Sequence, residues 1–172
     1  MNIIRFGGNR LVKSKQALRP FKIVLWILFI AYILAAFRLI IWKGWGGFAY
    51  ISQCYASIDI WKQSILWSLN LVPLRFVFDV RGYTVVAWCK NVIGNFFLFI
   101  PMGFFLPCLF PKVRVWSMKK YIFTMAALIT GIEIFQLLFM CGHCDIDDVI
   151  LNLSGACLGF AATRQVLKLI AL

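Results

Sequence analysis

The chain has 172 residues, of which 63% are hydrophobic and only 14% are charged, and its formal net charge is +12 at pH 7. Its mean hydropathy of +0.89 excludes an ordinary soluble domain, in which about half of the residues are apolar and about a quarter are charged. A nucleic-acid-binding role is excluded as well, because the Lys and Arg residues flank long apolar stretches instead of forming a basic groove or helix face.

Four apolar stretches are long enough to cross about 30 Å of hydrocarbon as helices of about 20 residues. The first follows a basic segment, as in a signal peptide, but it is too long for one and no small-residue cleavage site follows it. We therefore predict an all-α integral membrane protein, a single membrane domain over 1–172 built as a bundle of four transmembrane helices. The predicted spans are about 22–42, 91–111, 121–141 and 148–170.

Positive charge is concentrated on one side of this predicted bundle. Lys and Arg are frequent in 5–22 and in 112–120, whereas 141–147, between the third and fourth spans, contains neither. Short basic segments stay in the cytoplasm. We therefore expect both termini and 112–120 inside, and 141–147 outside.

The connection between the first and second spans, roughly 44–90, is long and rich in Trp and Phe, with isolated charges. This composition favours a partly interfacial or re-entrant outer segment over a fifth span. A fifth crossing would also break the charge bias between the two sides.

Glu133 lies within the third apolar span, and Gln136 follows it one turn later. A carboxylate at membrane depth is costly unless it is paired, hydrated or protonated, so such residues usually face the bundle interior and carry function. The alternative is a structural role, in which a protonated Glu133 bonds a neighbouring helix.

A second polar group opens the fourth span, with Asp145, Asp147, Asp148 and Asn152. Asp148 and Asn152 share a helix face, as do Asp145 and Asp148. Capping of the helix N-terminus would explain one Asp, but three acids and an Asn exceed what a cap requires. Both a shared site and simple capping remain open.

The second span contributes Asn91 and Asn95, one turn apart near its beginning. Their amides could donate to the carboxylates, or they could join helices as amides do in bilayers.

The order of these polar residues resembles the signature of VanZ-like membrane proteins over about 70–159. The matching motifs are Asn70-x-x-Pro73, Asn91-x-x-x-Asn95-x-x-x-Phe99-x-Pro101-x-Gly103, Glu133-x-x-Gln136 and Asp145-x-Asp147-Asp148-x-x-x-Asn152-x-x-Gly155. The family often has Gly-Arg shortly before the Asp cluster, where this chain has Cys141-Gly142-His143-Cys144. Arg75 or His143 would then supply the counter-charge.

The resemblance implies a bacterial plasma-membrane protein, of a family sometimes linked to resistance against teicoplanin and related lipidated glycopeptides. It implies no settled catalytic mechanism, and enzyme activity stays open.

Two other functions are consistent with parts of the sequence. Cys141 and Cys144 form a CxxC pair with an intervening His, as in thioredoxin-like disulfide isomerases, although no βαβ context surrounds it. A four-helix membrane thiol-disulfide oxidoreductase with an outward CxxC pair fits the predicted bundle better. An ordinary loop disulfide or a pair of unreactive thiols is the structural alternative. Carboxylate and Asn oxygens also suit hard cations, which leaves a metal-dependent lipid-headgroup enzyme as a second alternative, although no metal site or cofactor is predicted.

We therefore expect polar residues from several spans to line an outward-opening pocket. It would engage a membrane lipid, a lipid-linked cell-wall precursor or a lipidated antibiotic. The pocket residues are Asn95, Glu133, Gln136, Asp145, Asp148 and Asn152, with Asn70, Arg75, Asn91 and His143 in support.

Overall fold

The computed structural model describes residues 7–42, 46–75 and 85–170, and this part of the chain is almost entirely helical. Residues 76–84 of the predicted outer connection lie outside the described residues. The described helices are α1 (Gly7–Trp42), α2 (Gly47–Cys54), α3 (Ile58–Ser68), α5 (Val85–Leu109), α6 (Pro111–Arg114), α7 (Met118–Leu138) and α8 (Ile146–Ile170). Two short strands, β1 (Leu69–Asn70) and β2 (Cys144–Asp145), pair in parallel.

Four of the described helices are long and apolar enough to cross a membrane, which confirms the predicted all-α membrane bundle. Their apolar segments are Pro20–Ile41, Asn91–Leu109, Met118–Leu138 and Ile146–Leu169. The third begins and ends slightly earlier than the predicted 121–141. At most 39% of the residues in any of these windows are buried inside the protein, so most of their apolar surface requires lipid as its solvent.

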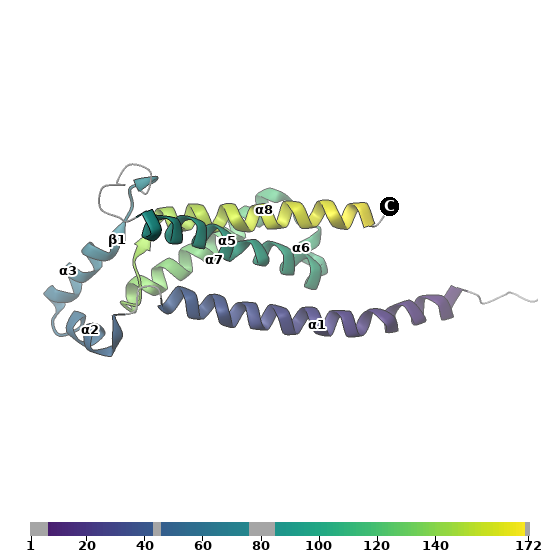
Figure 1. The fold of residues 1–172 in the computed structure, drawn as a ribbon, viewed down its shortest axis with the longest axis horizontal. Helices are drawn as coiled ribbons and strands as arrows, with labels where there is room; N and C mark the ends of the chain where they lie inside the picture. Colours follow the sequence, from purple (N-terminus) through teal and green to yellow (C-terminus); the bar gives the residue numbers. More distant parts are fainter. Residues whose placement is uncertain (1–6, 43–45, 76–84, 171–172) are drawn as a thin grey trace, which may run out of the picture.

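The two ends of the bundle differ in what they carry. α2, α3 and the paired strands lie at one end, whereas α6, the beginning of α1 and the end of α8 lie at the other (Figure 1). α6 carries Lys112 and Arg114 in its last turn. The basic connection and the acidic turn before α8 are therefore at opposite ends, as the charge pattern predicted.

Glycines hold α5 and α8 in close contact. A Cβ atom added at Gly155 would overlap the carbonyl oxygen of Phe96, and one at Gly159 would overlap that of Ile100. Gly155 and Gly159 form a GxxxG pair, the small-residue spacing that lets membrane helices approach backbone to backbone. This contact fixes the beginning of α8 beside the beginning of the second span in α5.

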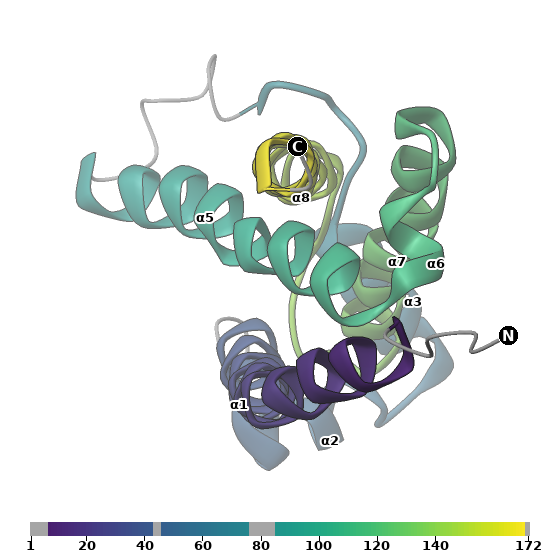
Figure 2. The same ribbon diagram turned by 90° about the vertical axis from the view of Figure 1, so that its right-hand side faces the viewer.

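The core lies between α5, α7 and α8. The ring of Tyr121 from α7 stacks on that of Phe160 from α8, with centroids 3.9 Å apart, and Phe99 of α5 is buried in the same cluster. α1 lies along one side of this group (Figure 2). It is tied to α5 by the Tyr32 hydroxyl, which donates to the Leu98 carbonyl at 2.9 Å.

α2 and α3 form the described part of the outer connection. Their large apolar side chains remain exposed, with 79% of Phe48 and 86% of Trp67 accessible, as is typical of helices at a membrane surface. The Tyr55 hydroxyl, between the two helices, donates to the Leu138 carbonyl at the end of α7. The connection is thus fixed to the same end of the bundle as the strands.

Candidate functional site

The strand pair brings two distant segments of the chain together. Asn70 of β1 lies opposite Asp145 of β2, and the Asn70 side-chain amide donates to Asp145 Oδ1 at 2.9 Å. The pairing therefore places Asn70, a predicted supporting residue, directly on the acidic turn before α8.

Asp145 caps α8 and also contacts the third span. Its Oδ1 accepts the Asp147 backbone N–H at 2.8 Å, which is the bond expected of an N-cap residue. Its own backbone N–H donates to Glu133 Oε2 at 3.2 Å. Glu133 is only 3% exposed, so it faces the protein interior and the acidic turn. The capping explanation is therefore correct for Asp145, but it does not account for the other two aspartates.

Asp147 is a central residue of the site that the predicted pocket omitted. It is 2% exposed, and its Oδ1 accepts the backbone N–H of Leu74 at 2.5 Å. Leu74 has a φ of +60°, a backbone conformation that costs a non-glycine residue about 1 kcal/mol or more. The Asp147 carboxyl thus holds Leu74 in a strained conformation, a few residues after the strand pair fixes Asn70. In the sequence, the only indication of this role is that Asp147 belongs to the motif Asp145-x-Asp147-Asp148-x-x-x-Asn152-x-x-Gly155.

Asp148 points to the second span. The side-chain amide of Asn95 donates to Asp148 Oδ1. This bond joins α5 to α8 next to the contact between Gly155 and Phe96. Asn152, one turn further along α8, is 5% exposed, and its Oδ1 has no hydrogen-bond partner within the part of the chain that is described. Buried acceptors in native proteins almost always accept a hydrogen bond. We therefore expect a donor from outside the described residues to bond Asn152 Oδ1.

Gln136 follows Glu133 by one turn on α7, but its side-chain amide bonds a different helix. Its side-chain amide donates to the Ile40 carbonyl at 3.1 Å, tying α7 to the end of α1. Its backbone carbonyl accepts the Cys141 N–H at 3.0 Å in a helix-ending turn where Met140 has a φ of +50°. Gln136 therefore fixes the end of α7 and its contact with α1, next to the acidic residues.

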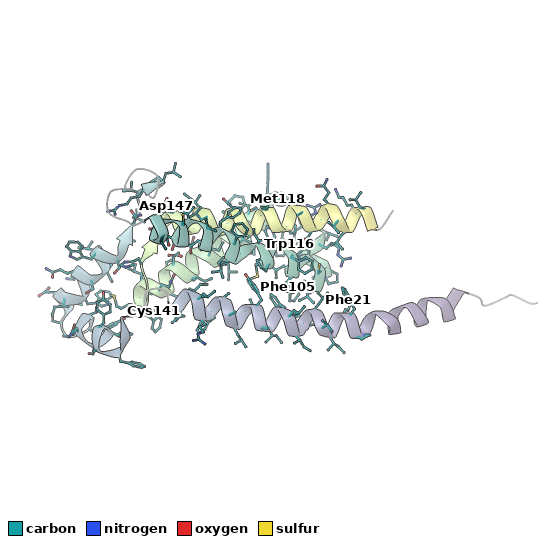
Figure 3. All side chains as sticks on the ribbon, in the orientation of Figure 1. Phe21, Phe105, Trp116, Met118, Cys141 and Asp147 are labelled. Carbon is teal, nitrogen blue, oxygen red and sulfur yellow. The ribbon has the colours of Figure 1, made fainter. Side chains whose placement is uncertain are left out.

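The remaining predicted supporting residues are Asn91, Arg75 and His143, and none of the three is fully buried. Asn91 is half-buried one turn before Asn95 in α5, Arg75 is exposed immediately after Leu74, and His143 is exposed in the turn between α7 and β2. Figure 3 shows Asp147 and Cys141 at the end of the bundle that carries the strands, with Phe21 and Phe105 farther along it.

Cys141 and Cys144 are free thiols in the turn before α8. Burial raises the pKa of the Cys141 thiol. Burial also raises the pKa of Cys144, and the negative charges of Glu133 and Asp145 raise it further. Reactive cysteines usually have lowered pKa values, so these surroundings do not favour thiol-disulfide chemistry.

We expect both thiols to react slowly with iodoacetamide at pH 8, because a raised pKa leaves less thiolate at a given pH. The rate should continue to increase at pH values where an ordinary cysteine, with a pKa of about 8.5, already approaches its plateau. Mass spectrometry of single Cys141→Ser and Cys144→Ser variants would measure each rate separately. Alkylation faster than that of free cysteine at pH 7 would contradict the expected protection.

The carboxyl and amide groups at this end of the bundle form hydrogen bonds. Among the residues that the structure describes, no three His, Cys, Asp or Glu side chains are grouped so that they could hold a metal ion. Four carboxyl groups and three side-chain amides instead meet at one end of the bundle. We refer to these seven residues, which come from β1, α5, α7, β2 and α8, as the polar site: Asn70, Asn95, Glu133, Asp145, Asp147, Asp148 and Asn152.

The chain is similar in sequence to known proteins of one family. A protein-family model described as VanZ/LLP1 matches residues 23–168. The chain is 34% identical over 92 residues to "Protein VanZ" of Enterococcus faecium, an alignment that covers 54% of this chain and 50% of that protein. The chain thus spans about half the length of this curated relative, and no solved structure matches it. Because the family model matches most of the chain, including the polar site and nearly all of the four spans, the chain is a membrane protein of the VanZ/LLP1 family.

Proposed function

We propose that the protein lies in the bacterial plasma membrane with both termini in the cytoplasm and the polar site at the outer face. The support is the charge difference between the two ends. The end with α6 carries basic residues, whereas the opposite end carries Glu133, Asp145, Asp147 and Asp148. Basic segments between spans remain on the cytoplasmic side.

In this proposal the polar site binds the polar part of a lipid, a lipid-linked cell-wall precursor or a lipidated antibiotic. Its support is the meeting of buried polar side chains from three spans with the acceptor Asn152 Oδ1, which has no partner among the described residues. Such groups are expensive at the edge of a membrane and usually mark a ligand path. A site rich in acceptors is complementary to ligands that donate N–H or O–H groups.

We propose further that the protein contributes to resistance against teicoplanin or related lipoglycopeptides, by binding or remodelling at the outer leaflet. The support is membership of the VanZ/LLP1 family together with the similarity to "Protein VanZ" over 54% of the chain.

Expression in a sensitive bacterium tests this function. We expect tolerance to teicoplanin to rise while tolerance to vancomycin, which carries no lipid tail, stays unchanged. Glu133→Gln and Asp148→Asn should each reverse most of the rise, because loss of one charged hydrogen-bonding group weakens binding by about 1.4 kcal/mol, or about tenfold. Minimum inhibitory concentrations at matched protein levels would provide the measurement.

Asp59→Asn is a matched control, since Asp59 is an exposed carboxylate in the first turn of α3, outside the polar site. It should keep full tolerance. Equal tolerance in wild type, Glu133→Gln and Asp148→Asn would show that the polar site has no part in the function.

A further inference from the structure

The whole net charge of the chain lies in three segments. Residues 5–22, 112–120 and 164–168 hold twelve of the eighteen Lys and Arg residues and none of the six Asp and Glu residues. Elsewhere six basic residues balance the six acidic ones, so the net charge of +12 belongs to these segments alone. Their described parts lie at the end of the bundle opposite the polar site (Figure 1). We refer to this end as the basic end.

Two cations of the basic end are held at one residue, Trp116. The Nζ atom of Lys120, in the first turn of α7, lies 4.8 Å from the centre of the Trp116 ring. The guanidinium of Arg164, from α8, donates to the Trp116 carbonyl at 3.1 Å. Its Cζ atom also lies 5.4 Å from the centre of the Phe160 ring. Cation–π contacts of this kind hold long basic side chains in place. We refer to Trp116, Lys120 and Arg164 as the Trp116 cluster.

Arg164 is not an ordinary orientation signal. Lys and Arg in short connections set the orientation of a membrane protein, but Arg164 is half-buried within the membrane-spanning segment Ile146–Leu169. The helix dipole favours cations in the last turn of α8, which holds Lys168 and not Arg164. A charge within a span is costly and usually marks a functional site. Neither bland explanation therefore accounts for Arg164.

The positive charge of Arg164 has no acidic partner in the described part of the chain. Its guanidinium makes one hydrogen bond there, to the Trp116 carbonyl, which uses one of its five N–H donors. On α8 the nearest acidic residue is Asp148, sixteen residues earlier and thus about 24 Å away along the helix. The negative charge that complements Arg164 is therefore expected from a partner.

The position of the Trp116 cluster indicates which anion it meets. The cluster lies where the third span begins, just after the second span ends, so it is at the depth of lipid headgroups, where Trp is enriched. The neighbouring surface is apolar and exposed, with 79% of Val115 and 75% of Phe123 accessible. Acyl chains cover such a surface, and the phosphates attached to them then lie beside the cations.

The charge of the basic end selects among phospholipids. Arg binds a phosphate through paired N–H bonds, and Lys binds it as a point charge. A zwitterionic headgroup would bring a further cation to an end that has no acidic residue in its three segments. An anionic headgroup brings net negative charge, and basic surfaces between spans are typical binding places for such lipids.

We propose that the Trp116 cluster binds the phosphate of an anionic phospholipid through Arg164 and Lys120. The leaflet rests on the proposed function: with both termini in the cytoplasm, this lipid belongs to the inner leaflet. The lipid site itself lies at the opposite end of the bundle from the polar site and is independent of antibiotic tolerance.

Native mass spectrometry of the full-length protein in detergent tests the proposal, by titration with phosphatidylglycerol or with phosphatidylcholine of the same acyl chains. We expect the wild type to bind the first phosphatidylglycerol at least about tenfold more tightly than phosphatidylcholine, because each cation beside an anionic lipid contributes about fivefold. Arg164→Gln and Lys120→Gln should each weaken phosphatidylglycerol binding about fivefold and leave phosphatidylcholine binding unchanged. Arg164→Lys, which keeps the charge but loses the paired donors, should weaken it less than Arg164→Gln.

Lys119→Gln is the matched control. Lys119 is exposed and directly precedes Lys120 on α7, so the variant removes the same charge at a position about 100° around the helix from Lys120. Phosphatidylglycerol binding should stay close to the wild-type value. Monodisperse elution and an unchanged thermal midpoint would show that each variant is folded.

Three results would overturn the proposal. Equal losses in Lys119→Gln, Lys120→Gln and Arg164→Gln would mean that the basic end attracts anions only as diffuse charge. Equal wild-type affinity for the two lipids would exclude an anion-selective site. Displacement of phosphatidylglycerol by inorganic phosphate at comparable concentration would assign the site to a soluble anion.

The binding measurement needs neither an antibiotic nor a defined orientation, so its outcome is separate from that of the proposed function. Green fluorescent protein fused to the C-terminus, which becomes fluorescent in the cytoplasm and stays dark outside, tests the leaflet. A fluorescent fusion without lipid selectivity would leave the proposed orientation standing and remove the lipid site. Selective binding with a dark fusion would keep the lipid site and overturn both the proposed orientation and the inner leaflet.

Discussion

Gly155→Leu should prevent the bundle from folding. A Cβ atom at this position would overlap the Phe96 carbonyl oxygen, and backbone cannot move aside as a flexible side chain can. α5 and α8 would have to separate. The separation would remove their close packing and the nearby Asn95–Asp148 hydrogen bond. We expect a loss of at least about 3 kcal/mol. Yield of monodisperse protein in detergent and its thermal unfolding midpoint would measure the effect.

Gly94→Leu is the matched control. It makes the same change at an exposed position of α5, where an added Cβ atom meets nothing within 4 Å. It should leave both yield and midpoint close to wild type. Gly155→Ala should fall between the two, since it adds only the Cβ atom. An unfolding midpoint for Gly155→Leu within a few degrees of the Gly94→Leu value would contradict the close contact between α5 and α8.

The spans could be predicted because lipid imposes a simple rule on the sequence. A helix in hydrocarbon needs a long run without charges, and each of the four runs is interrupted by charge only near its ends or at Glu133. The polar residues of the site could be found for the same reason. Asn95, Glu133 and Asp148 are conspicuous against apolar neighbours, and the structure places all three at the same end of the bundle.

The partners of these residues could not be predicted, because they depend on how the helices pack. Helical spacing separates Asp147 from the face shared by Asp148 and Asn152, and its bond to the Leu74 N–H joins it to a segment that is distant in the sequence. Gln136 follows Glu133 by one turn, yet its amide bonds the Ile40 carbonyl of α1. Such contacts depend on how distant segments of the chain pack together. The spacing of residues within one helix does not predict that packing.

Asp147→Ala should release the backbone around Leu74 and abolish teicoplanin tolerance. The Asp147 carboxyl accepts the Leu74 N–H at 2.5 Å and thereby holds Leu74 at a φ of +60°. A buried hydrogen bond to a charged group contributes about 1.5–3 kcal/mol, enough to offset strain of about 1 kcal/mol in the backbone. Without the carboxyl, the Leu74 amide should exchange its hydrogen at least tenfold faster. Hydrogen–deuterium exchange by mass spectrometry, with minimum inhibitory concentrations in parallel, would measure both effects.

Asp147→Asn separates a positioning role from a role of the charge itself. The Asn side chain keeps a carbonyl oxygen where Asp147 Oδ1 accepts the Leu74 N–H, so exchange at Leu74 should remain slow. Because Asp147 holds Leu74 in place through this hydrogen bond, tolerance should survive in Asp147→Asn and be lost in Asp147→Ala. Leu74→Gly, which removes the strain at a positive φ, should partly restore protection when combined with Asp147→Ala. Unchanged exchange at Leu74 in Asp147→Ala would mean that the segment is held by other contacts, and tolerance lost equally in both variants would mean that the negative charge itself is required.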